Sequence, residues 1–184
     1  VPVRLAGLLQ SVGEAHWYAG RLDEALPPLR EAIALFDRAY GPDTYDAAGV
    51  YLDLAQVLQD QEAYADAEAA VDHAVRVRSR RGPEAGDTAI ALSVKASIAG
   101  HRGRHAEAIE LATRSVEIGA TSMPPDDATF LVLRSTLSAR LAAAGRRAEA
   151  LAILDEILAT AAKAGIEGVN VTTWRRQRAE LARR

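Results

Sequence analysis

Four histidines are the side chains of this sequence best suited to hold a metal ion, because imidazole is a common metal ligand and the chain has no cysteine. His101 and His105 are four residues apart, the spacing of a ligand pair on one helix. Gly103 lies between them in a predicted turn, however, so we expect the two imidazoles on different helices. His16 and His73 belong to other segments. The sequence therefore predicts no metal site.

Paired carboxylates are the next candidate chemistry, since two converging acids can act as general acid and general base. Neighbouring residues on a helix point in different directions, so an adjacent pair cannot form one such site. The sequence also places no glycine-rich phosphate loop after a strand and no serine in a nucleophile elbow. We therefore expect neither an enzyme nor a cofactor. The adjacent acids are Asp23–Glu24, Asp155–Glu156 and Asp126–Asp127, of which the last pair suits the start of a helix.

The C-terminal segment concentrates positive charge. Residues 171–184 carry five arginines and one glutamate, a net charge of +4 that leaves −7 on the rest of the chain. Such a segment could contact nucleic acid or an acidic partner. Val171, Trp174 and Leu181 nevertheless trace one helical face, which is typical of a helix that closes a repeat array. We therefore expect a basic capping helix over 171–184 and no nucleic-acid partner.

The composition indicates which elements position these residues. Of the 184 residues 49% are hydrophobic and only 5% aromatic, and about one in five is alanine, the best helix former. This composition excludes an all-β fold and predicts an all-α chain that forms one domain or one short repeat array. No run of eighteen apolar residues and no signal peptide is present, so we expect a cytoplasmic protein with no membrane partner. The excess of arginine over lysine suggests a bacterial source.

The chain repeats itself with a nearly constant period. Four turn segments end in alanines that are separated by 42, 41 and 42 residues, namely Ala25, Ala67, Ala108 and Ala150. Twelve positions before each alanine a small residue recurs: Gly13, Ala55, Ala96 and Ser138. Seven positions after each alanine lies a second column, formed by Ala32, Ala74, Ser115 and Ile157. Small residues in such columns let neighbouring helices pack closely, so the pattern predicts stacked helical hairpins.

Breaker residues separate the units. Three connectors pair a helix-ending residue with proline and an acid that suits the positive end of the next helix: Gly41-Pro42-Asp43, Gly82-Pro83-Glu84 and Met123-Pro124-Pro125-Asp126. Glycine is expected there in the left-handed conformation. The periodicity predicts helices over 3–19, 22–40, 43–60, 64–81, 85–101, 105–119, 126–144, 147–164 and 172–183, and it requires no strand.

These columns, turns and connectors resemble the tetratricopeptide repeat family, in the 42-residue form of the kinesin light chain, over residues 5–164. The resemblance implies a right-handed α-α superhelix of four hairpins followed by the capping helix. The array would cover 1–170, with repeats over 5–41, 42–82, 83–123 and 124–165. It also implies a protein-interaction scaffold that binds a peptide or partner domain in a concave groove lined by the first helix of each hairpin.

Carrying the family's groove positions onto this sequence gives the candidate site. The first two units supply Gln10, Glu14, Trp17, Tyr18, Asp53, Gln56, Gln59 and Asp60. The third unit supplies Ser93, Ser97 and His101, and the fourth only Ser135, Ala139, Ala142 and Ala143. The acids favour a basic partner segment and the amides favour an extended backbone, while the two aromatic residues suit interface anchors. These positions offer no arginine or lysine for a partner's terminal carboxylate.

Other interpretations of the same residues remain open. Trp17 could pack at the end of its hairpin, with the acids forming a solvated helix face. The chain could also be the regulatory or sensor segment of a larger bacterial signalling enzyme or transcription regulator, docking on its own catalytic domain. Its first residue is not methionine, which favours an upstream part. A further interpretation is self-association through the apolar run Leu131–Leu133, which one hairpin could not wholly bury.

Overall fold

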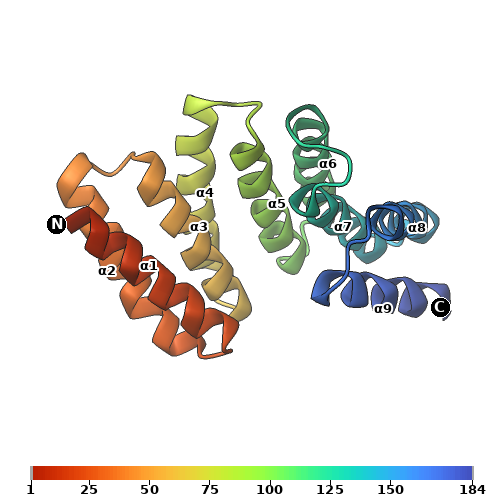
Figure 1. Ribbon diagram of the computed structural model, residues 1–184, viewed down its shortest axis with the longest axis horizontal. Helices are drawn as coiled ribbons and strands as arrows, with labels where there is room; N and C mark the ends of the chain where they lie inside the picture. The colour runs from red at the N-terminus through yellow and green to blue at the C-terminus, as the bar shows by residue number, and fades with distance from the viewer. Residues whose placement is uncertain (1, 184) are drawn as a thin grey trace. The chain divides into compact units, whose positions relative to one another are not determined.

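Helices account for 84% of the computed structural model, which describes residues 2–183 except the side chains of Pro2 and Arg81. Over residues 2–183 the structure has nine helices and no strand, which confirms the all-α fold class (Figure 1). Each predicted boundary lies within three residues of the observed one. The helices are α1 (Pro2–Tyr18), α2 (Leu22–Tyr40), α3 (Tyr45–Asp60), α4 (Tyr64–Arg81), α5 (Gly86–His101), α6 (His105–Ser122), α7 (Ala128–Ala143), α8 (Arg147–Ala164) and α9 (Val169–Arg183).

The turn inside each hairpin requires one left-handed residue. Gly20, Gly103 and Gly145 have φ of 73°, 75° and 80°, which glycine adopts without steric cost. The second unit has Glu62 at the same position, with φ of 60°. The next backbone N–H then reaches back to the ending helix, as Arg21 N does to His16 O at 2.9 Å. The four turns therefore share one geometry, although one of them lacks glycine.

The connectors between hairpins differ from the prediction in how they use their acids. Asp43 does not cap α3; its carboxylate accepts hydrogen bonds from Arg76 and Arg80 of α4, at 2.7–2.9 Å. Thr44 is the N-cap of α3 and accepts from the N–H of Ala47 at 3.2 Å. Glu84 likewise pairs with Arg114 of α6. Gly82 has φ of −164°, so the left-handed glycine predicted there was wrong.

Asp127 behaves as the sequence predicts. It is the N-cap of α7, and its Oδ1 accepts hydrogen bonds from the N–H groups of Thr129 and Phe130 at 2.8 and 3.1 Å. An N-cap carboxylate satisfies donors that have no partner within the helix and also meets the positive end of its dipole. The acid therefore fixes where α7 begins.

The chain divides between Pro83 and Glu84 into two compact units, each described here by itself. In the first unit α1 packs on α2, α2 on α3, and α3 on α4. In the second unit α5 packs on α6 and α7, α6 on α7, and α8 on both α7 and α9. The repeated small residues lie at these contacts: Ser115 Oγ donates to Ala89 O at 2.7 Å, and Ser138 Oγ to Ala150 O at 2.8 Å.

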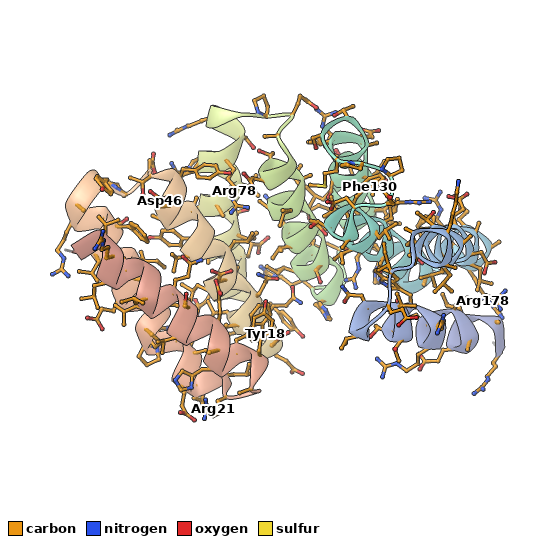
Figure 2. All side chains as sticks on the ribbon, viewed as in Figure 1. Tyr18, Arg21, Asp46, Arg78, Phe130 and Arg178 are labelled. Atoms are coloured by element: carbon orange, nitrogen blue, oxygen red, sulfur yellow. The ribbon has the colours of Figure 1, made fainter. Side chains whose placement is uncertain are left out.

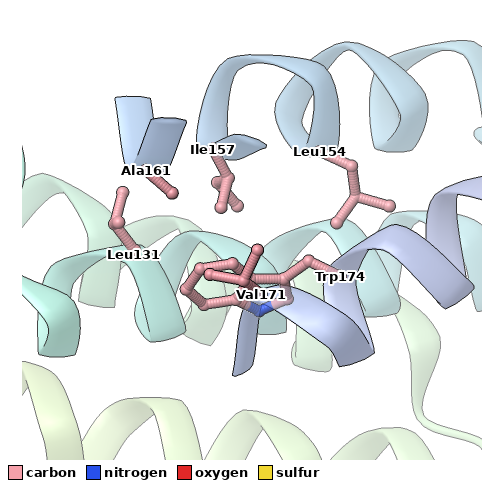
Figure 3. Packing of buried hydrophobic residues seen from close by; sticks show 6 residues of the cluster. All are labelled: Leu131, Leu154, Ile157, Ala161, Val171 and Trp174. Carbon is pink, nitrogen blue, oxygen red and sulfur yellow. The ribbon is translucent and has the colours of Figure 1, made fainter. Parts of the chain in front are cut away.

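Helix α9 packs by the apolar face that the sequence predicts. Val171 and Trp174 are buried with residues of α7 and α8, and Leu181 packs on the edge of the same cluster (Figure 3). Arg178 lies on the exposed side and donates to Asp155 of α8 at 2.7 Å (Figure 2). The remaining members of the cluster are Leu131, Leu154, Ile157 and Ala161.

The repeat register extends into α9, which the sequence analysis overlooked. Ala179 follows Ser138 by 41 residues and so continues the small column that begins at Gly13. Helix α9 also begins 41 residues after α7. It therefore occupies the place of the first helix of a further hairpin. The position that is the buried Leu131 in α7 is an exposed Thr172 in α9, so this end of the second unit is polar.

The proposed self-association run is mostly internal. Leu131 lies in the cluster around Trp174, and Leu133 lies in a second cluster with Ile118 and Phe130. Only Val132 of the three is exposed. Because α7 is covered on two sides, the expectation that one hairpin leaves this run unburied was wrong. Within residues 2–183 no helix is long and apolar enough to cross a membrane.

Candidate functional site

Helices α1 and α3 of the first unit bring three predicted site residues into one hydrogen-bonded cluster. Gln10 Nε2 donates to Asp53 Oδ2 at 2.7 Å and to Glu14 Oε1 at 3.2 Å. Gln10 and Glu14 are one turn apart on α1, so both face the same side of that helix. A single amide therefore holds two carboxyl groups close together at the seam between the two helices.

A second bridge joins the C-terminal ends of the same helices. Trp17 Nε1 donates to Asp60 Oδ2 at 2.6 Å, and the indole is half-buried. The ring of Tyr18 stacks on that of Trp17, with centroids 5.1 Å apart and planes inclined by 26°. Tyr18 is 79% exposed at the end of α1 (Figure 2). The indole thus holds the two helices together, while the phenol ring is the aromatic surface open to a partner.

The two remaining amides of this unit lie on α3 and differ in their bonding. Gln56 Nε2 donates to the backbone oxygen of Leu52 at 3.5 Å, so its side-chain oxygen remains available. Gln59 Oε1 is buried and accepts no hydrogen bond from the residues that the structure describes. Both side chains are half-buried. The face formed by α1 and α3 therefore offers carboxylates, amide oxygens and one exposed aromatic ring.

Burial changes the protonation of the central cluster. Removal from water raises the pKa of Asp53 to about 7, and the nearby carboxyl of Glu14 raises it further, whereas Gln10 and Arg78 act in the opposite direction. A carboxyl with this pKa is partly protonated at neutral pH. The site therefore holds less negative charge than its two acids suggest, and an approaching cation would restore it.

Arg78 is a site residue that sequence reasoning missed, because it belongs to α4, the second helix of its hairpin. It is buried, its guanidinium lies 5.8 Å from the ring centroid of Tyr45, and burial lowers the pKa of the arginine. With Gln10, Phe36 and Gly49 it lines a pocket of about 430 Å³. The signal was present: Phe36, Arg78, Gly119 and Ala161 form one buried repeat column, in which an arginine stands out.

In the second unit the predicted residues are less accessible. Ser93 is only 6% exposed, so a ligand could not reach its hydroxyl, and we leave it out of the site. Ser97 is half-buried, and its backbone oxygen accepts a hydrogen bond from Arg140 Nη1 at 3.1 Å. Arg140 also covers Gly100, where an added Cβ would lie 2.1 Å from the same nitrogen. His101 is exposed at the end of α5.

The fourth hairpin lines a small pocket with α9. Ala139 and Ala142 of α7 face Gln177, Glu180 and Leu181 across a volume of about 220 Å³. Ser135 is half-buried and Ala143 is exposed. The small side chains of α7 predicted for this hairpin thus leave space beside α9 and contribute no charged group to it.

The histidines lie as the sequence predicts. His101 ends α5 and His105 begins α6, so the two do not share a helix. His16 lies 3.4 Å from Glu24, and His73 stacks on Tyr51 with centroids 4.0 Å apart. Among the described residues there is no group of three or more His, Cys, Asp or Glu side chains placed to hold a metal ion.

Comparison with known proteins places this geometry in context. The family model for the tetratricopeptide repeat matches residues 4–79 and 46–120. The fold is similar to crystal structures of nearly identical TPR-like repeats of a kinesin light chain from Podosopora anserina. One, a single-substitution variant, has 18% identity and a TM-score of 0.79 over 99% of this chain and 86% of that one. The other has 18% identity and a TM-score of 0.75 over 100% and 92%.

A third solved structure, BtubC (BKLC) from P. vanneervenii, has 19% identity and a TM-score of 0.76 over 92% of this chain and 68% of that one. Among curated proteins none matches this chain. At these identities the solved structures establish the helical-repeat solenoid fold, and the groove chemistry is argued from the residues themselves.

Proposed function

This chain belongs to the tetratricopeptide repeat family, whose repeats generally mediate protein–protein interaction, and we propose that it is a scaffold that binds an extended, basic segment of a partner protein along α1 and α3. Scaffolds of this fold are typically non-catalytic. The contact surface in this proposal is the first-unit face, defined as Gln10, Glu14, Tyr18, Asp53, Gln56 and Asp60. It retains six of the residues expected from the sequence and assigns Trp17 a structural role in holding α1 to α3.

The observation that carries the proposal is the carboxyl pair at Gln10. The amide donates to Glu14 and Asp53 at once, so it satisfies one oxygen on each and leaves the other two for a further donor. A guanidinium or ammonium group is the donor that best matches two acids in a partly dry site, because it supplies both hydrogen bonds and the missing charge. The pair therefore favours an arginine or lysine of the partner.

The rest of the face suits the backbone that carries this cation. Gln56 can bond a peptide group with its free oxygen, and Asp60 is exposed beside Trp17. The ring of Tyr18 provides apolar area on a rigid stem and a surface for a second cation. Side chains in this order along two helices would contact a segment in extended conformation, which presents alternate residues to one side.

A displayed library of random twelve-residue peptides tests the proposal. The wild type should enrich sequences with arginine or lysine at a fixed position. A variant with Glu14→Gln and Asp60→Asn should lose that enrichment, because it removes charge and keeps shape. Glu31→Gln on the exposed side of α2 is the control for net charge and should select the same sequences as the wild type.

Two results would overturn this function. The wild type and the double variant could enrich the same peptides, which would mean that the first-unit face does not read charge. Alternatively, no basic consensus could emerge from the wild type at all. The latter outcome would favour recognition of a folded surface, such as a catalytic or regulatory domain on the same polypeptide, over recognition of a peptide.

A further inference from the structure

The outer face of α1 exposes a stripe of large apolar side chains. Leu5, Leu8 and Val12 are 44%, 65% and 45% exposed, and they follow one another at spacings of three and four. These positions lie on one side of the helix, away from Gln10 and Glu14 of the first-unit face. Scattered exposed leucines are common on protein surfaces, but a continuous row on one helix indicates a contact surface.

The repeat register shows what this face does elsewhere in the chain. Counting from the small column, Leu8 is equivalent to Val50 of α3 and Leu133 of α7. Those two residues are 0% and 2% exposed. In the first unit α2 packs on α3, and in the second unit α6 packs on α7. In both cases the covering element is the second helix of the preceding hairpin.

The contact in the second unit defines the chemistry of that covering helix. A Cβ added to Gly119 of α6 would lie 2.7 Å from Phe130 and 3.0 Å from Leu133. Ile118 packs in the same cluster. Phe130 is the register equivalent of Leu5. A helix that fits this face therefore combines a small residue at the crossing point with a neighbouring branched apolar residue.

We propose that the Leu5–Leu8–Val12 face of α1 is a docking site for the second helix of a further hairpin of this repeat type. The polar end formed by α9 argues against a second copy of the chain in a head-to-tail stack, because α9 has the exposed Thr172 where α7 has the buried Leu131. A pair of α1 faces alone would bury too little for a stable dimer, since specific interfaces bury on the order of 1,200 Å² or more. The occupant is therefore a helix with the chemistry of α6.

Thiol labelling can test this docking site, because the chain has no cysteine of its own. The probe is Leu8→Cys, and Val169→Cys, at an 83% exposed position of α9, is the control. Each is placed in the full chain and in an extended chain, in which a copy of residues 86–127 is joined directly to Val3 so that the copied α6 meets α1 in register. A second extension copies residues 3–44, which carry α2, to guard against one copy failing to fold.

The proposal predicts that either extension slows labelling of Leu8→Cys by about tenfold or more, while labelling at Val169→Cys stays unchanged. Adding Leu5→Glu to the extended chain should restore fast labelling, because a buried unpaired carboxylate opposes docking. Fast labelling in both extended chains would overturn the proposal. Protection of Leu8→Cys in the unextended chain that grows with protein concentration would overturn it too, because a second copy would then occupy the face.

Discussion

The side chain of Gln10 reaches Asp53, 43 residues along the chain, with Nε2 and Oδ2 2.7 Å apart. Trp17 reaches Asp60 across the same 43 residues at 2.6 Å, and Arg140 in the second unit reaches the backbone of Ser97, again 43 residues away. Neighbouring first helices are therefore joined at one residue more than the 42-residue repeat. The polar residues that form the proposed site also fix the spacing of the helices that present it.

The stability of the chain should fall as pH rises, because of Asp53. Its pKa is raised to about 7 in the folded state, from 3.8 for the unperturbed group. Between these values the folded state binds more protons than the unfolded state, so its stability decreases with pH and then levels off above 7. Asp53→Asn removes this loss and should raise the free energy of unfolding at pH 8 by about 2 kcal/mol.

Urea unfolding at pH 4, 6 and 8 checks this prediction. The gain from Asp53→Asn should shrink towards zero at pH 4, where the carboxyl is protonated in both states. A gain of the same size at all three values would show that Asp53 is not the titrating group. Glu31→Gln should leave the pH profile of the wild type unchanged.

Binding of a basic peptide should strengthen with pH over the same range. The partner's cation favours ionised Asp53, so a complex formed below pH 7 must first release its proton. Affinity for a selected arginine peptide should rise about tenfold from pH 6 to pH 8. Titration calorimetry in two buffers of different ionisation enthalpy measures the released proton, and Asp53→Asn should abolish both effects.

Replacing Glu62 with glycine should stabilise the first unit. Glu62 holds φ of 60° at a turn position where the other three hairpins have glycine. Glycine adopts this conformation without steric cost, so Glu62→Gly should raise the free energy of unfolding by about 0.5–1 kcal/mol. Gly20→Ala, with φ of 73°, should lower it by a similar amount. Stability changes of the same sign in both variants would contradict the turn geometry.

Two helical glycines should respond to alanine in opposite directions. A Cβ on Gly119 would meet the ring of Phe130 at 2.7 Å, whereas one on Gly7 would meet nothing within 4 Å. Gly119→Ala should therefore destabilise the chain by about 1–3 kcal/mol through overpacking. Gly7→Ala should stabilise it by about 0.5–1 kcal/mol through helix propensity. Thermal or urea unfolding of both variants checks the contrast.

The fold could be predicted from sequence because its period is visible in residue types. The small columns and breaker residues are local signals, and they placed each helix boundary within three residues. The turn at Glu62 was found by alignment with the glycines, since no single-residue propensity favours glutamate there. The acids of the connectors were assigned to helix dipoles, but Asp43 turned instead to Arg76, because a bidentate arginine offers it more than a dipole does.

The candidate site was less predictable. Family register selects first-helix positions, so it found Gln10 and Asp53 but could not show that they bond to each other. Arg78 was missed because its side chain crosses from the second-helix layer into the pocket between α1 and α3. The raised pKa of Asp53 depends on burial and on Glu14 together, and neither is visible before the helices are assembled in space.

The central claim is that the first-unit face binds a basic, extended segment. Backbone amide NMR spectra recorded during titration with a selected arginine peptide test it most directly. The account predicts chemical-shift changes centred on Glu14, Tyr18 and Asp60, and their loss in the variant that combines Glu14→Gln with Asp60→Asn. Saturable changes confined to α5–α9, or equal changes in the wild type and the variant, would contradict it.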